Sequence, residues 1–248
     1  MIRSILFNFI FWPIFVLYLA LLYPIIYFSS EKTTLHLGYI PVTKWLFFCL
    51  KHFAKIDYKV LNKDKIPEGQ IIIGCNHQSA WETFVFSLLF DNLVSVVKKE
   101  LLKKPIAGIY MKRLKCIPVD RESPVKAIKT LIKYSKIAYD DGKSILIFPN
   151  GTRSSDEEHT EYKSGIYAIY RSLGIPVVPA HVNSGKYWPR NSFKKNPGTI
   201  ILDFKEPIYP GLSKEEFFKE FEERLKLYGT FGKGSIKLRK GNNIDSTS

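Results

Sequence analysis

The chain has 248 residues, of which 46% are hydrophobic and 15% aromatic, and its formal net charge is +14. This length suffices for one sizeable α/β domain with appendages, and the hydrophobic content excludes a mainly disordered chain. The positive charge predicts an anionic partner, which could be nucleic acid, a phospholipid surface or a phosphorylated substrate.

The first segment is an uncharged apolar run over residues 5–28. At about 1.5 Å per residue, it is long enough to cross a bilayer or to dip deeply into it. A signal peptide is disfavoured because the run is too long and no small-residue cleavage site follows it. A buried soluble helix is disfavoured because such helices rarely lack polar positions over this length. Pro13 and Pro24 predict kinks, so the length of the segment does not establish that it crosses the bilayer at right angles.

A second apolar segment covers residues 43–55, with lysines at its margins. It is too short to span a bilayer and fits a helix that lies in the membrane interface. The alternative is a core helix of the globular domain. Together with the first segment, it predicts a two-helix membrane anchor over residues 1–57.

Strand and helix patterns alternate from residue 60 to residue 205. In chain order, strands are expected at 71–75, 93–101 (running into a helix), 116–121, 144–149, 175–182 and 199–204. Helices are expected at 81–90, 106–116, 123–142, 165–174 and 213–229, the last opened by a capping box. This alternation predicts an α/β domain with a mostly parallel sheet flanked by helices. The tail, residues 231–248, is expected to be disordered or to touch the membrane surface.

Polar residues follow the first predicted strand, in the stretch CNHQSAWETF (75–84). His77 lies where α/β proteins usually keep their chemistry, although a strand-to-helix turn also accommodates a structural histidine. Glu82 has two interpretations as well. It completes a capping box with Ser79, or it orients His77 and favours the protonated imidazole. This stretch alone leaves both open.

The strand at 144–149 runs into the stretch IFPNGTRS (147–154). Gly151 allows close approach of the backbone, and Arg153 offers a planar fork suited to a phosphate. An ordinary surface turn is the alternative, since NG is common in turns. Lys163 follows shortly afterwards and either adds a second cation or flanks a helix.

The cysteines Cys49, Cys75 and Cys116 are odd in number and widely spaced. Their spacing indicates neither a disulfide framework nor a metal site, which predicts a reducing, cytoplasm-facing catalytic region. Cys75 is a rival nucleophile because it lies two residues from His77.

Four motifs in order resemble the 1-acyl-glycerol-3-phosphate acyltransferase family of phospholipid synthesis, over roughly residues 70–185. The first is Asn76-His77, then four residues, then an acid, here Glu82. The second is the lysine-rich stretch 96–108 that leads to Ile117-Pro118-Val119-Asp120-Arg121, with Lys115 where the family usually has glycine. The third is Phe148-Pro149-Asn150-Gly151-Thr152-Arg153, in which Asn150 replaces the usual glutamate. The fourth is Val177-Val178-Pro179-Ala180.

The resemblance implies a glycerolipid acyltransferase domain over residues 58–230. Its reaction would transfer a fatty acyl group from acyl-CoA or acyl-carrier protein to the sn-2 hydroxyl of lysophosphatidic acid, giving phosphatidic acid. His77 would be the general base and Glu82 its partner, with no acyl-enzyme, metal or cofactor. The implied substrate-binding residues are Lys98, Arg121, Asn150, Gly151, Thr152 and Arg153.

The implied partners are a membrane lipid, the acyl donor and an anionic membrane surface rather than nucleic acid. The implied location is the membrane, with the domain on its cytoplasmic side. Three alternatives stay open. The first is acylation of glycerol-3-phosphate or another lysolipid, and the second is a membrane-tethered nucleic-acid-binding protein, suggested by charge alone. The third is a catalytically silent lipid-binding relative, suggested by Asn150.

Overall fold

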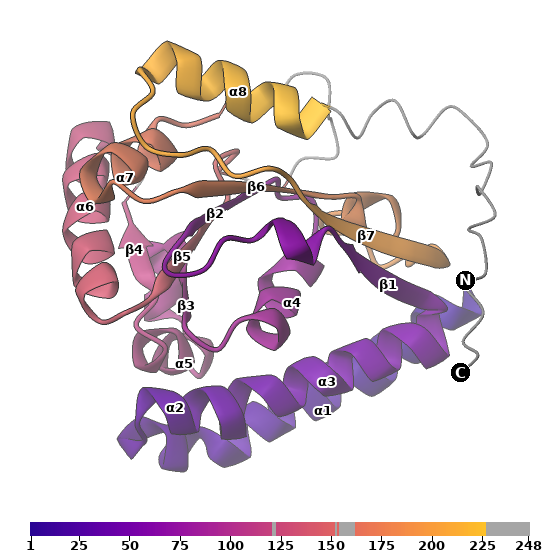
Figure 1. The fold of residues 1–248 in the computed structure, drawn as a ribbon. Helices are drawn as coiled ribbons and strands as arrows, with labels where there is room; N and C mark the ends of the chain where they lie inside the picture. Colours follow the sequence, from indigo (N-terminus) through magenta and orange to yellow (C-terminus); the bar gives the residue numbers. More distant parts are fainter. Residues whose placement is uncertain (121–122, 152, 154–161, 227–248) are drawn as a thin grey trace, which may run out of the picture.

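The strands of the protein form one twisted sheet with helices on both faces (Figure 1). The computed structural model describes residues 1–120, 123–151, 153 and 162–226. Within these ranges the strand order is β1-β7-β6-β2-β5-β3-β4. The strands are β1 (Ile56–Leu61), β2 (Ile72–Cys75), β3 (Leu93–Lys98), β4 (Ile117–Val119), β5 (Ser144–Ile147), β6 (Val177–Val182) and β7 (Gly198–Phe204). Every pair is parallel except β6 with β7, so the predicted mostly parallel sheet is confirmed.

The helices that cover the sheet begin and end close to the expected positions. They are α1 (Ile2–Phe28), α2 (Glu31–Thr33), α3 (Ile40–Cys49), α4 (Trp81–Leu89), α5 (Ala107–Arg113), α6 (Pro124–Asp140), α7 (Gly165–Leu173) and α8 (Lys214–Lys226). Wider π-type turns at Thr34–Tyr39 and Leu50–Ala54 extend α3 at both ends. The capping box of α8 is confirmed, since the backbone N–H of Ser213 donates to Glu216 and that of Glu216 donates to the Ser213 hydroxyl.

Central strands of the sheet are buried on both faces, which explains their continuous apolar sequences. All four residues of β2 and all six of β6 are buried. Successive side chains then point to opposite faces, so Ile73 and Cys75 pack with α1, α3 and α4, whereas Ile72 packs with α6, α7 and α8. Among the described residues, one large hydrophobic core therefore lies on each side of the sheet, and a smaller cluster joins α1 to α5.

The first core holds the N-terminal helices against the sheet. From α1 it contains Phe7 and Phe11, and from α3 it contains Leu46 and Cys49. The segment at 43–55 is therefore a core helix on one face, while Phe48 on its other face stays 47% exposed. The core-helix interpretation is thus confirmed for one face, and membrane contact of the exposed face stays a prediction.

Helix α5 ends at Arg113, before the end of the helix expected at 106–116, and Lys115 follows it. The φ of Lys115 is 53°, in the left-handed region, and the chain turns there into β4. This region is costly for residues with a Cβ, which is a physical reason for glycine at this position in the resembled family. The Lys115 ammonium lies 2.6 Å from Asp141 and 3.8 Å from Glu31, so an ion pair accompanies the strain.

Candidate active site

His77 lies in the loop between β2 and α4, at the carboxyl end of a central strand. The loop that begins with Phe148 follows the neighbouring strand β5, and Lys98 ends β3, the next strand along. Carboxyl ends of parallel strands meet at one edge of a sheet. The sheet order therefore brings three of the sequence motifs to a single edge.

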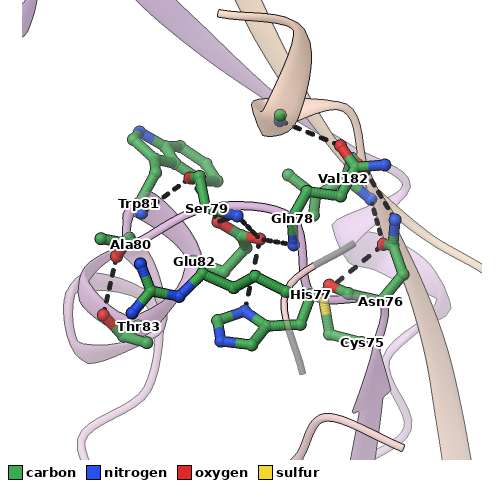
Figure 2. Close-up of polar contacts among 12 residues, drawn as sticks. Cys75, Asn76, His77, Gln78, Ser79, Ala80, Trp81, Glu82, Thr83 and Val182 are labelled. Atoms are coloured by element: carbon green, nitrogen blue, oxygen red, sulfur yellow. Dashed lines mark hydrogen bonds and ion pairs between the residues drawn. The ribbon is translucent and has the colours of Figure 1, made fainter. Parts of the chain in front are cut away.

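Glu82 is the partner of His77 in the structure, and it also holds the start of α4 (Figure 2). Its Oε1 lies 3.5 Å from Nδ1 of His77, a distance at the outer limit of a hydrogen bond. The same carboxylate accepts backbone N–H bonds from Gln78 at 2.5 Å and from Ser79 at 2.9 Å. The capping box with Ser79 is only half formed, because Ser79 N–H donates to Glu82 while the Ser79 hydroxyl accepts from Trp81, and Ala80 is the N-cap of α4. The role of Glu82 toward His77 stays a prediction.

The electrostatics of Glu82 favour its charged form. The side chain is fully buried, and burial alone would raise the pKa of the carboxyl group. The hydrogen bond and charge of His77, together with the backbone N–H groups of Gln78 and Ser79, outweigh burial and lower that pKa below its ordinary value of 4.5. With Nδ1 turned toward this carboxylate, the other ring nitrogen of His77 points away from it.

Phe148 positions the imidazole from the other side, and sequence reasoning did not single it out. Its ring stacks on the His77 ring with centroids 4.2 Å apart and planes 20° apart. The His77 side chain is 13% exposed, so the ring lies in a slot but keeps access to a reactant. Only the adjacency of β2 and β5 brings the two residues together.

The loop that carries His77 is fixed to β6 by amide side chains (Figure 2). Asn76 donates to the carbonyl of Val182 at 2.9 Å and accepts from the N–H of Val182 at 2.7 Å. Gln78 accepts from the N–H of Gly185 at 3.0 Å. These buried bonds satisfy backbone groups that the strand ends leave unpaired. Asn76 belonged to the first motif by sequence, but its role as a clamp depends on β6.

The loop after β5 begins with a tight turn, which fits both interpretations of this stretch. Gly151 has a φ of 72° and its N–H donates to the carbonyl of Phe148 at 2.9 Å, so a tight turn requires glycine there. The side-chain oxygen of Asn150 is buried and has no hydrogen-bond partner among the described residues. A buried acceptor of this kind is costly unless a ligand satisfies it.

Cations surround this edge of the sheet. Arg153 follows the turn, and its carbonyl accepts a hydrogen bond at 3.1 Å from the guanidinium of Arg190, a residue that sequence reasoning missed. Arg190 comes from the segment after β6, so no local signal connected it to Arg153. Lys98 is exposed at the end of β3. The predicted residues Arg121 and Thr152 lie outside the described residues.

Cys75 is poorly placed to act as a nucleophile. Its side chain is buried in the first core, and burial raises the pKa of the thiol well above its ordinary value. The described part of the chain also contains no group of three or more histidine, cysteine or acidic residues arranged to hold a metal ion.

Comparisons with known proteins show the family of this chain. A family model described as acyltransferase matches residues 57–183. A 1-acyl-sn-glycerol-3-phosphate acyltransferase from Pseudomonas aeruginosa is 38% identical over 162 residues, which are 64% of this chain and 63% of that protein. The enzyme of the same name from Bacillus subtilis is 33% identical over 61% of this chain and 73% of its own length.

A solved structure resembles the whole fold. It is the crystal structure of the 1-acyl-sn-glycerophosphate acyltransferase from Thermotoga maritima, with a TM-score of 0.67 and 24% identity, covering 96% of this chain and 99% of that one. The match extends beyond the segment that the family model covers and includes the N-terminal helices. By the family model and by these relatives, the chain belongs to the acyltransferase family.

Proposed function

We propose that the protein is an O-acyltransferase that moves a fatty acyl group from an acyl thioester to the sn-2 hydroxyl of 1-acyl-glycerol-3-phosphate, giving phosphatidic acid. The observation that carries this proposal is the His77–Glu82 pair at the carboxyl end of β2, beside the turn with Asn150 and Arg153. The names of the relatives supply the substrate class.

The residues suggest a direct transfer between the two substrates. With Nδ1 turned to Glu82, the other nitrogen of His77 takes the proton of the acceptor hydroxyl as the oxygen attacks the thioester carbonyl. The carbon–sulfur bond then breaks, and the imidazolium returns the proton to the leaving thiolate. Glu82 stabilises the imidazolium during this exchange and stays ionised. The scheme uses no cofactor, metal or acyl-enzyme.

The acceptor is held mainly by its phosphate in this proposal. Arg153 provides a bidentate fork for the phosphate, and Arg190 and Lys98 add charge to the same edge. The side chain of Asn150 lies in the turn beside this edge, and its amide can donate a hydrogen bond to an oxygen of the acceptor, since the single free hydroxyl of 1-acyl-glycerol-3-phosphate gives its proton to His77. Glycerol-3-phosphate or another lysolipid offers the same groups, so acceptor competition separates these substrates.

The N-terminal helices are proposed to lie in the membrane surface. By length and composition α1 could cross a membrane, and 17% of its most apolar window is buried inside the protein. Near its start, Ser4 accepts a bond from Lys195, and farther along the carbonyl of Leu19 accepts one from Tyr110. A helix bound to the domain along its length lies beside it rather than projecting from it. We infer an in-plane anchor on the cytoplasmic side, where the free thiols stay reduced.

The test is an acyl transfer assay in detergent with lysophosphatidic acid and a labelled long-chain acyl-CoA or acyl-carrier protein. The parent protein is expected to form phosphatidic acid, and the His77→Ala variant is expected to form none above background. Glycerol-3-phosphate and other lysolipids run as competing acceptors. Equal product from the parent and the His77→Ala variant would overturn the proposed mechanism.

A further inference from the structure

The outer face of α6 carries a row of lysines that the proposed site does not use. Lys126, Lys129, Lys133 and Lys136 follow one another at intervals of three and four residues, and all four are exposed. This spacing places them on one side of the helix, about 15 Å long, while Leu131 and Ala138 on the other side pack into the second core. No salt bridge of the described residues involves these four lysines.

A shallow groove runs beside this lysine row, between α6 and α7. It has a volume of about 530 Å³, and its half-buried floor includes Ile128, Ile132, Tyr167 and Ala168. The cations Arg171 and Lys214 also line it. An apolar floor with a charged rim is the composition of a protein–protein interface, where apolar contacts provide affinity and the rim provides orientation.

The lysine row does not face the proposed membrane surface. The exposed apolar residues of α1 lie on the side of the sheet that carries α3 and α4, whereas α6, α7 and α8 pack on the opposite side. Figure 1 shows α1 and α3 below the sheet and α8 above it, with α6 at the side. A bilayer that covers α1 leaves the lysine row open to the water phase.

The row begins near the active site. Helix α6 starts directly after β4, at the carboxyl edge of the sheet that also carries His77. The sheet order puts β5 and β3 between β2 and β4. A donor bound along α6 can therefore pass a flexible thioester arm over the ends of these two strands.

We propose that the lysine row and the adjoining α6–α7 groove dock an acidic acyl-carrier protein as the acyl donor. This inference rests on the proposed function. Four cations spread over this length, next to an apolar floor, complement an acidic helix of a protein better than a compact nucleotide, which needs a smaller and deeper pocket. The donor thus approaches from the water phase while the acceptor enters from the membrane side.

The test compares the parent with Lys129→Glu/Lys133→Glu and with the control Lys59→Glu/Lys63→Glu, which makes the same charge change near β1 at the other edge of the sheet. For the row variant, KM for the acylated carrier protein is expected to rise about tenfold or more, because charge reversal at a rim opposes association. Its kcat, its KM for acyl-CoA and its thermal stability should match the parent. The control should match the parent with both donors.

Direct binding of the acylated carrier protein, measured by fluorescence anisotropy, keeps this test separate from activity. Weaker binding by the row variant supports the docking surface even where no acyl transfer is seen. Absence of acyl transfer in the parent would overturn the proposed function instead. A parent that uses acyl-CoA and neither binds nor uses the carrier protein overturns the docking proposal alone. Equal kinetics and binding in parent and row variant overturn it too. The docking proposal is also overturned if the row variant loses binding to vesicles of phosphatidylethanolamine and phosphatidylglycerol. That loss would show that the lysine row binds lipid.

Discussion

The imidazole of His77 stacks on the phenyl ring of Phe148, with ring centroids 4.2 Å apart. Glu82 contacts the same imidazole at its edge, through Nδ1. Two elements that are far apart in the chain thus fix both the plane and the direction of one ring. The proposed base is held before any substrate arrives, which is the condition for efficient proton transfer.

Phe148→Leu removes the stacking surface and keeps an apolar side chain. We expect kcat to fall about tenfold to a hundredfold, since small displacements of a catalytic group have effects of this size, while KM for both substrates changes little. Steady-state kinetics of the purified variant measure the change. Phe148→Tyr keeps the ring and should restore most of kcat. Parent-like kcat in Phe148→Leu would show that stacking does not position His77.

Glu82→Gln keeps the shape of the side chain and removes its charge. In the parent, backbone N–H groups donate to the carboxylate, and the amide of the variant meets these donors less well. We therefore expect the free energy of unfolding to fall by about 1–3 kcal/mol. We expect kcat to fall by about two to four powers of ten. The pKa of Glu82 is lowered in the folded protein, so its stabilising contribution is present above pH 4.5 and is lost as the pH falls through the folded value. Denaturant unfolding at several pH values should show this loss in the parent and not in the variant.

Asn150 tests how the acceptor is held. Asn150→Ala removes the side-chain amide, and we expect kcat/KM for lysophosphatidic acid to fall about tenfold because one hydrogen bond to the acceptor is lost. The KM for the acyl donor should stay unchanged. Equal activity in Asn150→Ala and the parent would remove Asn150 from the substrate site.

His181 on β6 makes stability depend on pH outside the active site. Burial, together with the nearby charge of Lys205, lowers the pKa of His181 to about 4. Between about pH 6.5 and pH 4, His181 is therefore protonated in the unfolded chain but not in the folded protein. The free energy of unfolding falls as the pH decreases through this range. The loss is at most about 1.4 kcal/mol per pH unit. Thermal unfolding of parent and His181→Gln across this range should diverge, and parallel curves would contradict the shift.

Lys115 tests the backbone at the start of β4. Lys115→Gly relieves the left-handed φ of 53° and loses the ion pair with Asp141, whereas Lys115→Ala loses the pair and keeps the strain. We expect the glycine variant to be more stable than the alanine variant by about 1 kcal/mol, because a Cβ is unfavourable in this region. Denaturant unfolding measures the difference. A more stable alanine variant would show that the chain leaves this conformation readily.

Local pattern sufficed for the elements whose burial is uniform. The strands β2, β5 and β6 are mostly apolar because both of their faces are covered, and α6 shows its spacing because one face is buried. The strand β1 was not predicted although its burial alternates as in a half-buried edge strand, because the run is short and charged residues stand between its apolar ones. The segment at 43–55 stayed ambiguous because one face packs in the core and the other is exposed.

The sequence by itself determined which chemical groups the protein can use. His77 and Glu82 are five residues apart, and the turn with Gly151 is local, so their relation does not depend on the rest of the fold. Only the tertiary structure decided that Phe148 stacks on His77, that Arg190 adjoins Arg153, and that the lysines of α6 face away from α1. The reason is that these contacts join segments that are distant in the chain. The order of strands in the sheet brings such segments together, and the periodicity of a single segment does not predict that order.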